Sequence, residues 1–233
     1  MSVPAAAPPG EADPDRSPAA AAVPSAAVVD LLGVLAYGEL TAFERLAADA
    51  RLAPTLEDEA ALAGMAVAEF GHFRRLHDRL AAAGVDPEAA MQPFVRPLDA
   101  FHESTEPSDW LEGLVKAYVG DGIAADFYRE VSGWLDEDTR TLVLDVLADT
   151  GHAGFAVERV RAAIAAEPAV AGRLALWARR LVGEALTQAQ RVAAERESLA
   201  GLLAGGDPAD VLALFGRITA EHTRRMTSLG LSP

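Results

Sequence analysis

The chain has 233 residues, a length that suits one domain with a sizeable core. It contains no cysteine, which excludes disulfides, thiolate metal sites and cysteine nucleophiles. A formal net charge of -15, without a basic stripe, argues against nucleic acid as a partner. Because no apolar run of membrane-spanning length and no secretory leader pattern is apparent, we expect a cytoplasmic protein without a membrane anchor.

The composition indicates an all-α protein. Ala and Leu are abundant, Gly and Pro concentrate at breaks, and no strand pattern is visible. Residues 1–24 combine Ala, Gly and acidic residues with six prolines, a composition typical of a disordered tail. We therefore predict such a tail over 1–24, a helical bundle over 25–166, and further helices over 167–233 that pack on the bundle.

The first two predicted helices each carry ionisable residues on an apolar face. Helical spacing of apolar residues predicts a helix over 26–50, with Glu39 in the middle of its apolar stripe. A second helix is predicted over 56–83, with Thr55 as its N-cap. Its stripe contains both Glu69 and His72.

Residues 84–108 contain four prolines and are too long for a tight helix hairpin. We expect this segment to cross the bundle, with a short helix near 87–91. The crossover would make the helices on either side of it parallel neighbours.

Four more helices are predicted after the crossover. Asp109 caps a helix over 109–135, whose apolar stripe contains Asp121. A continuous helix over 136–167 follows, with Asp149 and His152 in its stripe. The next helix is predicted over 168–203. The last one begins at Pro208, with Asp207 as its N-cap.

An acid and a histidine three residues apart occur at Glu69/His72, at Asp149/His152 and at a third place in the crossover. Residues at this spacing share a helix face, so each pair could bind one metal ion together. The composition predicts fewer than one such pair by chance. The third pair, Asp99/His102, has no helix of its own assured, and we interpret it as a chance match.

Buried carboxylates support a shared site. An ionised carboxylate on an apolar face is costly unless it is paired or binds a metal. The sequence places one on each of four helices, and the two helix pairs have nearly equal offsets, which puts the groups at a similar height. Pairing with an arginine is the alternative for Glu39, and a lone histidine is more often a hydrogen-bonded core residue. We predict a dinuclear metal site.

This arrangement resembles the ferritin-like di-iron carboxylate family, in which two helices give a Glu each and two give Glu-x-x-His, with one long crossover. The resemblance covers about residues 27–166. More narrowly, the chain resembles bacterial relatives of a tRNA hydroxylase that acts on a prenylated, methylthiolated adenosine, among them actinobacterial ferritin-like proteins of unassigned role. It implies a ferritin-like four-helix bundle with one long crossover and two extra C-terminal helices. The implied metal ligands are Glu39, Glu69, His72, Asp121, Asp149 and His152.

The resemblance also implies a function. The cofactor would be two iron ions, although manganese suits the same nitrogen and oxygen donors. The activity would be that of a dioxygen-dependent oxidase or hydroxylase, with an electron donor and a small-molecule or modified-nucleoside substrate. Binding should weaken in mild acid as the histidines protonate. The alternatives are an iron-binding ferroxidase without an organic substrate and a non-catalytic interaction module, and a homodimer is one assembly to consider.

The chain departs from the family pattern in using Asp at two of the four carboxylate positions, which leaves the metal preference open. Asp126 competes with Asp121, but it lies off the apolar stripe, so we prefer Asp121. Tyr118, one turn before Asp121, could hydrogen-bond a ligand, although core packing explains it more simply. Gly71 and Gly151 inside the two paired motifs suggest room for close helix approach or for a substrate.

Overall fold

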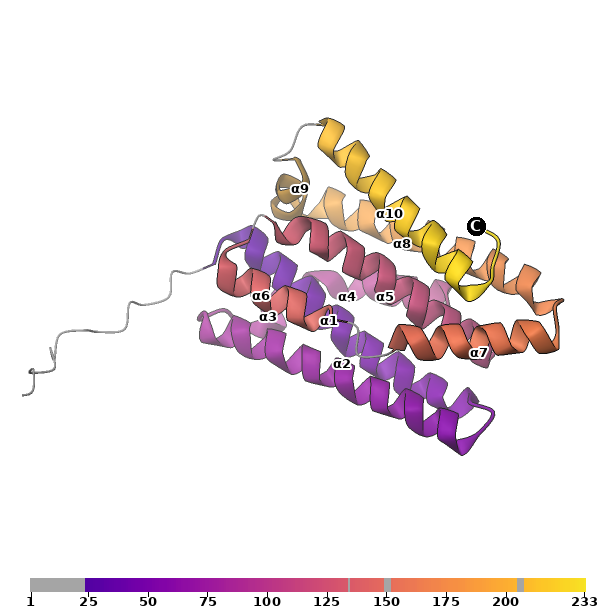
Figure 1. Cartoon of the computed structure of the whole chain (residues 1–233). Helices are drawn as coiled ribbons and strands as arrows, with labels where there is room; N and C mark the ends of the chain where they lie inside the picture. The colour runs from indigo at the N-terminus through magenta and orange to yellow at the C-terminus, as the bar shows by residue number, and fades with distance from the viewer. Residues whose placement is uncertain (1–23, 134, 149–151, 205–207) are drawn as a thin grey trace, which may run out of the picture.

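The computed structural model describes residues 24–133, 135–148, 152–204 and 208–233, which form a bundle of helices (Figure 1). No strand occurs among these residues. The all-α prediction is therefore confirmed. The predicted disordered tail lies outside the described residues, apart from Pro24.

An antiparallel helix pair begins the fold. α1 (Ala26–Asp49) leads through the short 3-10 helix η1 (Ala50–Leu52) to α2 (Leu56–Ala82). Thr55 caps α2 as predicted, because its hydroxyl oxygen accepts from the Asp58 N–H at 3.1 Å. The two helices lie against each other along their length (Figure 1).

The crossover is more ordered than the sequence suggested. It contains α3 (Pro87–Met91), which confirms the predicted short helix, followed by η2 (Gln92–Phe94) and α4 (Val95–Ser104). The sequence did not assure a helix around Asp99 and His102, but α4 contains both residues and is supported by its packing on α1 and α8. A very close approach holds α3 against α1: a Cβ added to Gly33 would lie 2.3 Å from the Ala90 carbonyl oxygen.

The second half of the bundle consists of α5 (Trp110–Ser132), α6 (Glu137–Val146) and α7 (His152–Ala166). α5 runs in the same direction as α2, and α6 and α7 return along it (Figure 1). The prediction of one continuous helix over 136–167 is wrong, since α6 ends at Val146 and α7 begins at His152. The backbone leaves the helix at Leu147, whose carbonyl oxygen accepts a hydrogen bond of 3.2 Å from the Arg129 guanidinium.

Three C-terminal helices cover one side of the bundle: α8 (Val170–Glu195), α9 (Glu197–Ala204) and α10 (Pro208–Leu229). The single helix predicted over 168–203 is divided at Arg196, whose guanidinium pairs with Asp30 of α1, as does the hydroxyl of Ser198. This tertiary contact outweighs the local helical tendency. α8 and α10 both pack on α5, and the predicted cap Asp207 lies outside the described residues.

The expectation that no apolar run reaches membrane-spanning length is wrong for one segment. Ala26–Leu52, essentially α1, is long and apolar enough to cross a membrane by length and composition, with a mean hydropathy of 1.6. A core helix passes the same test, and the leucines of α1 lie in both clusters of buried side chains in the bundle.

Candidate metal centre

Two clusters of buried apolar side chains fill the bundle and leave a polar layer between them. One cluster includes Leu32 of α1 and Leu80 of α2, and the other includes Leu46 and Leu62 of the same helices. Six ionisable residues of α1, α2, α5 and α7 fall in the chain between the segments that build the two clusters. These residues are Glu39, Glu69, His72, Asp121, Tyr128 and His152.

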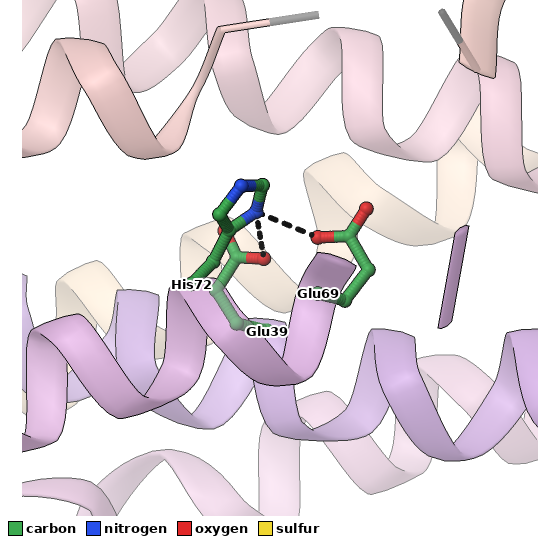
Figure 2. A group of neighbouring side chains, drawn as sticks. All are labelled: Glu39, Glu69 and His72. Carbon is green, nitrogen blue, oxygen red and sulfur yellow. Dashed lines mark hydrogen bonds and ion pairs between the residues drawn. The ribbon is translucent and has the colours of Figure 1, made fainter. Parts of the chain in front are cut away.

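Glu69 is the centre of this layer. Its Oε2 lies 3.1 Å from Nδ1 of His72, and its Oε1 lies 3.2 Å from Nδ1 of His152. The same His72 nitrogen lies 3.5 Å from Oε2 of Glu39. Figure 2 shows Glu39 reaching from α1 toward the pair on α2, and one ligand atom from each of the three side chains lies within 4.8 Å of the others. One carboxylate thus joins two histidines from opposite halves of the bundle.

The pKa values of these groups reflect their crowding. Burial, together with the neighbouring Glu69 carboxylate, raises the pKa of Glu39 well above its ordinary value. Burial also acts to raise the pKa of Glu69, but hydrogen bonds with His152 and His72 outweigh it and lower that pKa well below its usual range. Contacts with Glu39 and Glu69 raise the pKa of His72 to about 9. The cluster therefore favours one ionised carboxylate beside cationic imidazole.

Asp121 is the predicted ligand on α5. Burial among protein atoms raises its pKa well above the ordinary value, and the negative charge of Glu69 adds to the effect. The side chain nevertheless keeps exposed surface. Both observations fit a carboxylate that is open on one side and surrounded by protein on the others.

Asp126, the competitor of Asp121, faces a different part of the molecule. Its Oδ2 lies 2.7 Å from Nη1 of Arg225 on α10, and its Oδ1 lies 3.3 Å from Nη1 of Arg129. Two arginines thus compensate this carboxylate. The other predicted ligand of the second half, Asp149, lies outside the described residues, as does Gly151.

The third acid–histidine pair lies on α4 and binds other partners. Asp99 accepts a hydrogen bond of 2.7 Å from the Tyr37 hydroxyl. Nε2 of His102 lies 3.2 Å from the Thr41 hydroxyl oxygen, and burial with nearby positive charge lowers the pKa of His102 to about 3. Asp99 and His102 therefore have separate partners, Tyr37 and Thr41.

Two tyrosines of α5, Tyr118 and Tyr128, have different surroundings. Tyr118 packs against the apolar core, as its stripe suggested. Tyr128 was not singled out in the sequence; burial raises the pKa of its phenol, and the negative charge of Glu39 adds to this effect. Its position seven residues after Asp121, on the same helix face, was the available signal. A Cβ added to Gly71 would meet nothing within 4 Å, so this glycine does not serve close helix packing.

The residues present fit a metal ion. Carboxylates and imidazoles are donors that suit iron or manganese. Among the described residues, neither Glu39 nor Glu69 forms an ion pair with Lys or Arg, which removes the arginine-paired interpretation of Glu39. Two carboxylates this close, with only imidazoles for compensation, are arranged as a cation would require.

Fold and site together define a ferritin-like helical protein. The family model described as "Ferritin-like domain, actinomycetes" matches residues 24–206, and the chain belongs to this family. The match agrees with the resemblance found in the sequence.

A comparison with solved structures bears on the fold. A solved structure from Synechococcus, described as a protein with aldehyde deformylating oxidase activity, aligns with a TM-score of 0.70 and 19% sequence identity. The alignment covers 89% of this chain and 93% of that chain. At this identity the likeness shows the fold. A search of curated proteins finds no match.

Proposed function

We propose that this protein is a dinuclear metal oxidase or hydroxylase that uses dioxygen, with two iron ions held by Glu39, Glu69, His72, Asp121, Asp149 and His152. The observation that carries the proposal is the Glu69 carboxylate, whose two oxygens each lie beside a different histidine. A carboxylate with one ligand neighbour on each oxygen is suited to bridge two ions.

The roles of the residues follow from their places. Glu39 and His72 would hold one ion, His152 would hold the other, and Glu69 would contribute to both, while the Asp121 carboxylate would add to the charge balance. When bound, ferrous ions would supply the electrons for dioxygen reduction. Phe43 and Phe70 follow close on two of these ligands in the sequence, and their ring centroids are 5.2 Å apart.

The oxidase class has two supports beyond the ligands. The family and fold are those of ferritin-like proteins, and a structural neighbour has oxidase activity in its description. The substrate class stays a proposal at the level of an organic molecule, with an external electron donor to return the metal to its reduced state.

The test uses the purified full chain, loaded with ferrous iron without oxygen. We expect about two irons per chain and dioxygen consumption that depends on the loaded iron. Glu69→Gln should abolish loading of at least one ion, whereas Glu44→Gln, at an exposed position on α1, should load normally. Dioxygen consumption that stops after one oxidation of the iron, with or without added reductant and cell extract, would favour the ferroxidase alternative. Normal loading of Glu69→Gln would sink the proposal.

A further inference from the structure

The outer face of α2 carries a stripe of apolar and small residues that no described element covers. Leu56 and Val67 are 83% and 69% exposed, and Phe70 at the edge of the stripe is 39% exposed. The other members are Ala60, Ala63, Gly64 and Gly71, all exposed. A Cβ added to either glycine would meet nothing within 4 Å, so the surface is flat and open.

Charges at the two ends of this stripe are of opposite sign. Glu57 stands at the N-terminal end of α2 and Arg75 toward its C-terminal end, both exposed. They are eighteen residues apart, five turns at about 3.6 residues per turn, so they lie on the same side of the stripe. Arg75 also lies 3.2 Å from Asp145, but 45% of its side chain remains exposed.

This pattern is self-complementary in one orientation. When two copies of α2 meet antiparallel around a two-fold axis, Glu57 of each copy faces Arg75 of the other, and the axis passes close to Val67. A parallel two-fold contact would instead bring Glu57 of both copies to the same level on opposite sides of the seam, and it would pair neither with Arg75. Leu56 of each copy would meet the aliphatic stem of Arg74 in the other, whose length can cover apolar surface.

We propose that the outer face of α2 is a homodimer interface, closed by an antiparallel α2–α2 contact centred at Val67. An isologous contact of this kind satisfies both copies at once and does not propagate into a filament. The small residues at the centre allow the two helix backbones to approach closely, while the exposed apolar side chains leave water. The proposal does not depend on the metal centre.

The first measurement is the mass of the full chain in solution by light scattering and sedimentation equilibrium. We expect a concentration-dependent dimer of the 24.4 kDa chain. Val67→Glu should give the monomer mass, because it places two carboxylates at the axis. Leu176→Glu, at a position 66% exposed on α8, should leave the dimer unchanged. Circular dichroism of each variant verifies the fold.

A charge exchange tests the orientation. Glu57→Arg and Arg75→Glu should each weaken the dimer at least tenfold, and the double variant should recover most of the affinity. Because the chain has no cysteine, Val67→Cys provides a clean cross-link: mild oxidation should join two copies, whereas Leu176→Cys should not. A wild-type monomer at every concentration, a dimer that survives Val67→Glu, or a double variant as weak as the single ones would overturn the proposal.

Discussion

Oε1 of Glu69 lies 3.2 Å from Nδ1 of His152, although the two residues belong to opposite halves of the bundle. This contact connects α2 to the first residue of α7 across the polar layer. Neither helix pair can complete the cluster by itself. The site thus depends on how the two halves pack, and the variants below separate packing from metal binding.

Glu39→Gln should separate the two roles of that carboxylate. In the metal-free protein, Glu39 and Glu69 crowd each other without Lys or Arg compensation, so Gln should leave the thermal midpoint unchanged or raise it by about 2–4 °C, which corresponds to ~1 kcal/mol. The rise in midpoint on adding Mn²⁺ should shrink. Differential scanning calorimetry measures both effects. Glu44→Gln serves as the control, and a lower midpoint with undiminished metal stabilisation would contradict the account.

Gly33→Ala should destabilise the protein by at least ~1–3 kcal/mol, because the new Cβ would lie 2.3 Å from a backbone oxygen of α3 that cannot rotate away. The matched control is Gly183→Ala on α8, where the new methyl meets nothing within 4 Å. That variant should gain ~0.5–1 kcal/mol from helix propensity. Urea denaturation followed by circular dichroism compares them, and equal effects would show that α3 does not press on α1.

Arg225→Ala should cost about 2–4 kcal/mol, since it removes the guanidinium that compensates Asp126 at 2.7 Å in a mostly buried pair. Arg129 still reaches that carboxylate, which keeps the loss below the full cost of an uncompensated buried charge. The neighbouring Arg224→Ala removes an exposed pair with Glu221 and should leave the denaturation midpoint unchanged. Equal midpoints for both variants would mean that α10 is not anchored through Arg225.

His102 should make the stability depend on pH. The pKa of His102 is about 3 in the folded protein and 6.5 in the unfolded chain. Below pH 6.5 the imidazole is therefore protonated in the unfolded chain but stays neutral in the folded protein. Stability is therefore complete above pH 6.5 and falls as the pH decreases, by at most ~1.4 kcal/mol per pH unit. The positive charges of Lys116 and Arg45 act in the same direction.

Denaturant unfolding between pH 7 and 5 measures this slope before most carboxylates titrate. His102→Gln should flatten it, whereas His77→Gln, whose side chain is 43% exposed, should not. An unchanged slope in His102→Gln would assign the acid sensitivity to other groups.

Much of the fold could be predicted from periodicity and caps. Apolar spacing and the Thr55 cap placed α1 and α2 within a residue or two of their observed ends. The same reasoning missed the division at Arg196, because the cause is a contact with Asp30 more than a hundred residues away. It also joined α6 to α7, because the apolar stripe continues past Leu147, where the backbone leaves the helix.

Part of the candidate site could also be predicted from the pattern of apolar residues. Ionisable residues inside apolar stripes indicated Glu39, Glu69 and His72, which the structure brings together. The sequence could not show that Glu69 would lie between His72 and His152, because that depends on the packing of two halves. Tyr128 was missed, although it lies seven residues after Asp121 on the same helix face.

The most direct test of the central claim is a titration of the metal-free chain with Mn²⁺, followed by electron paramagnetic resonance. The account predicts that about two ions bind per chain and give an exchange-coupled spectrum, since Glu69 would bridge them. Glu69→Gln should lose the coupled signal while keeping its helical circular dichroism. A spectrum of isolated ions at every ratio, or a coupled spectrum that survives Glu69→Gln, would contradict the account.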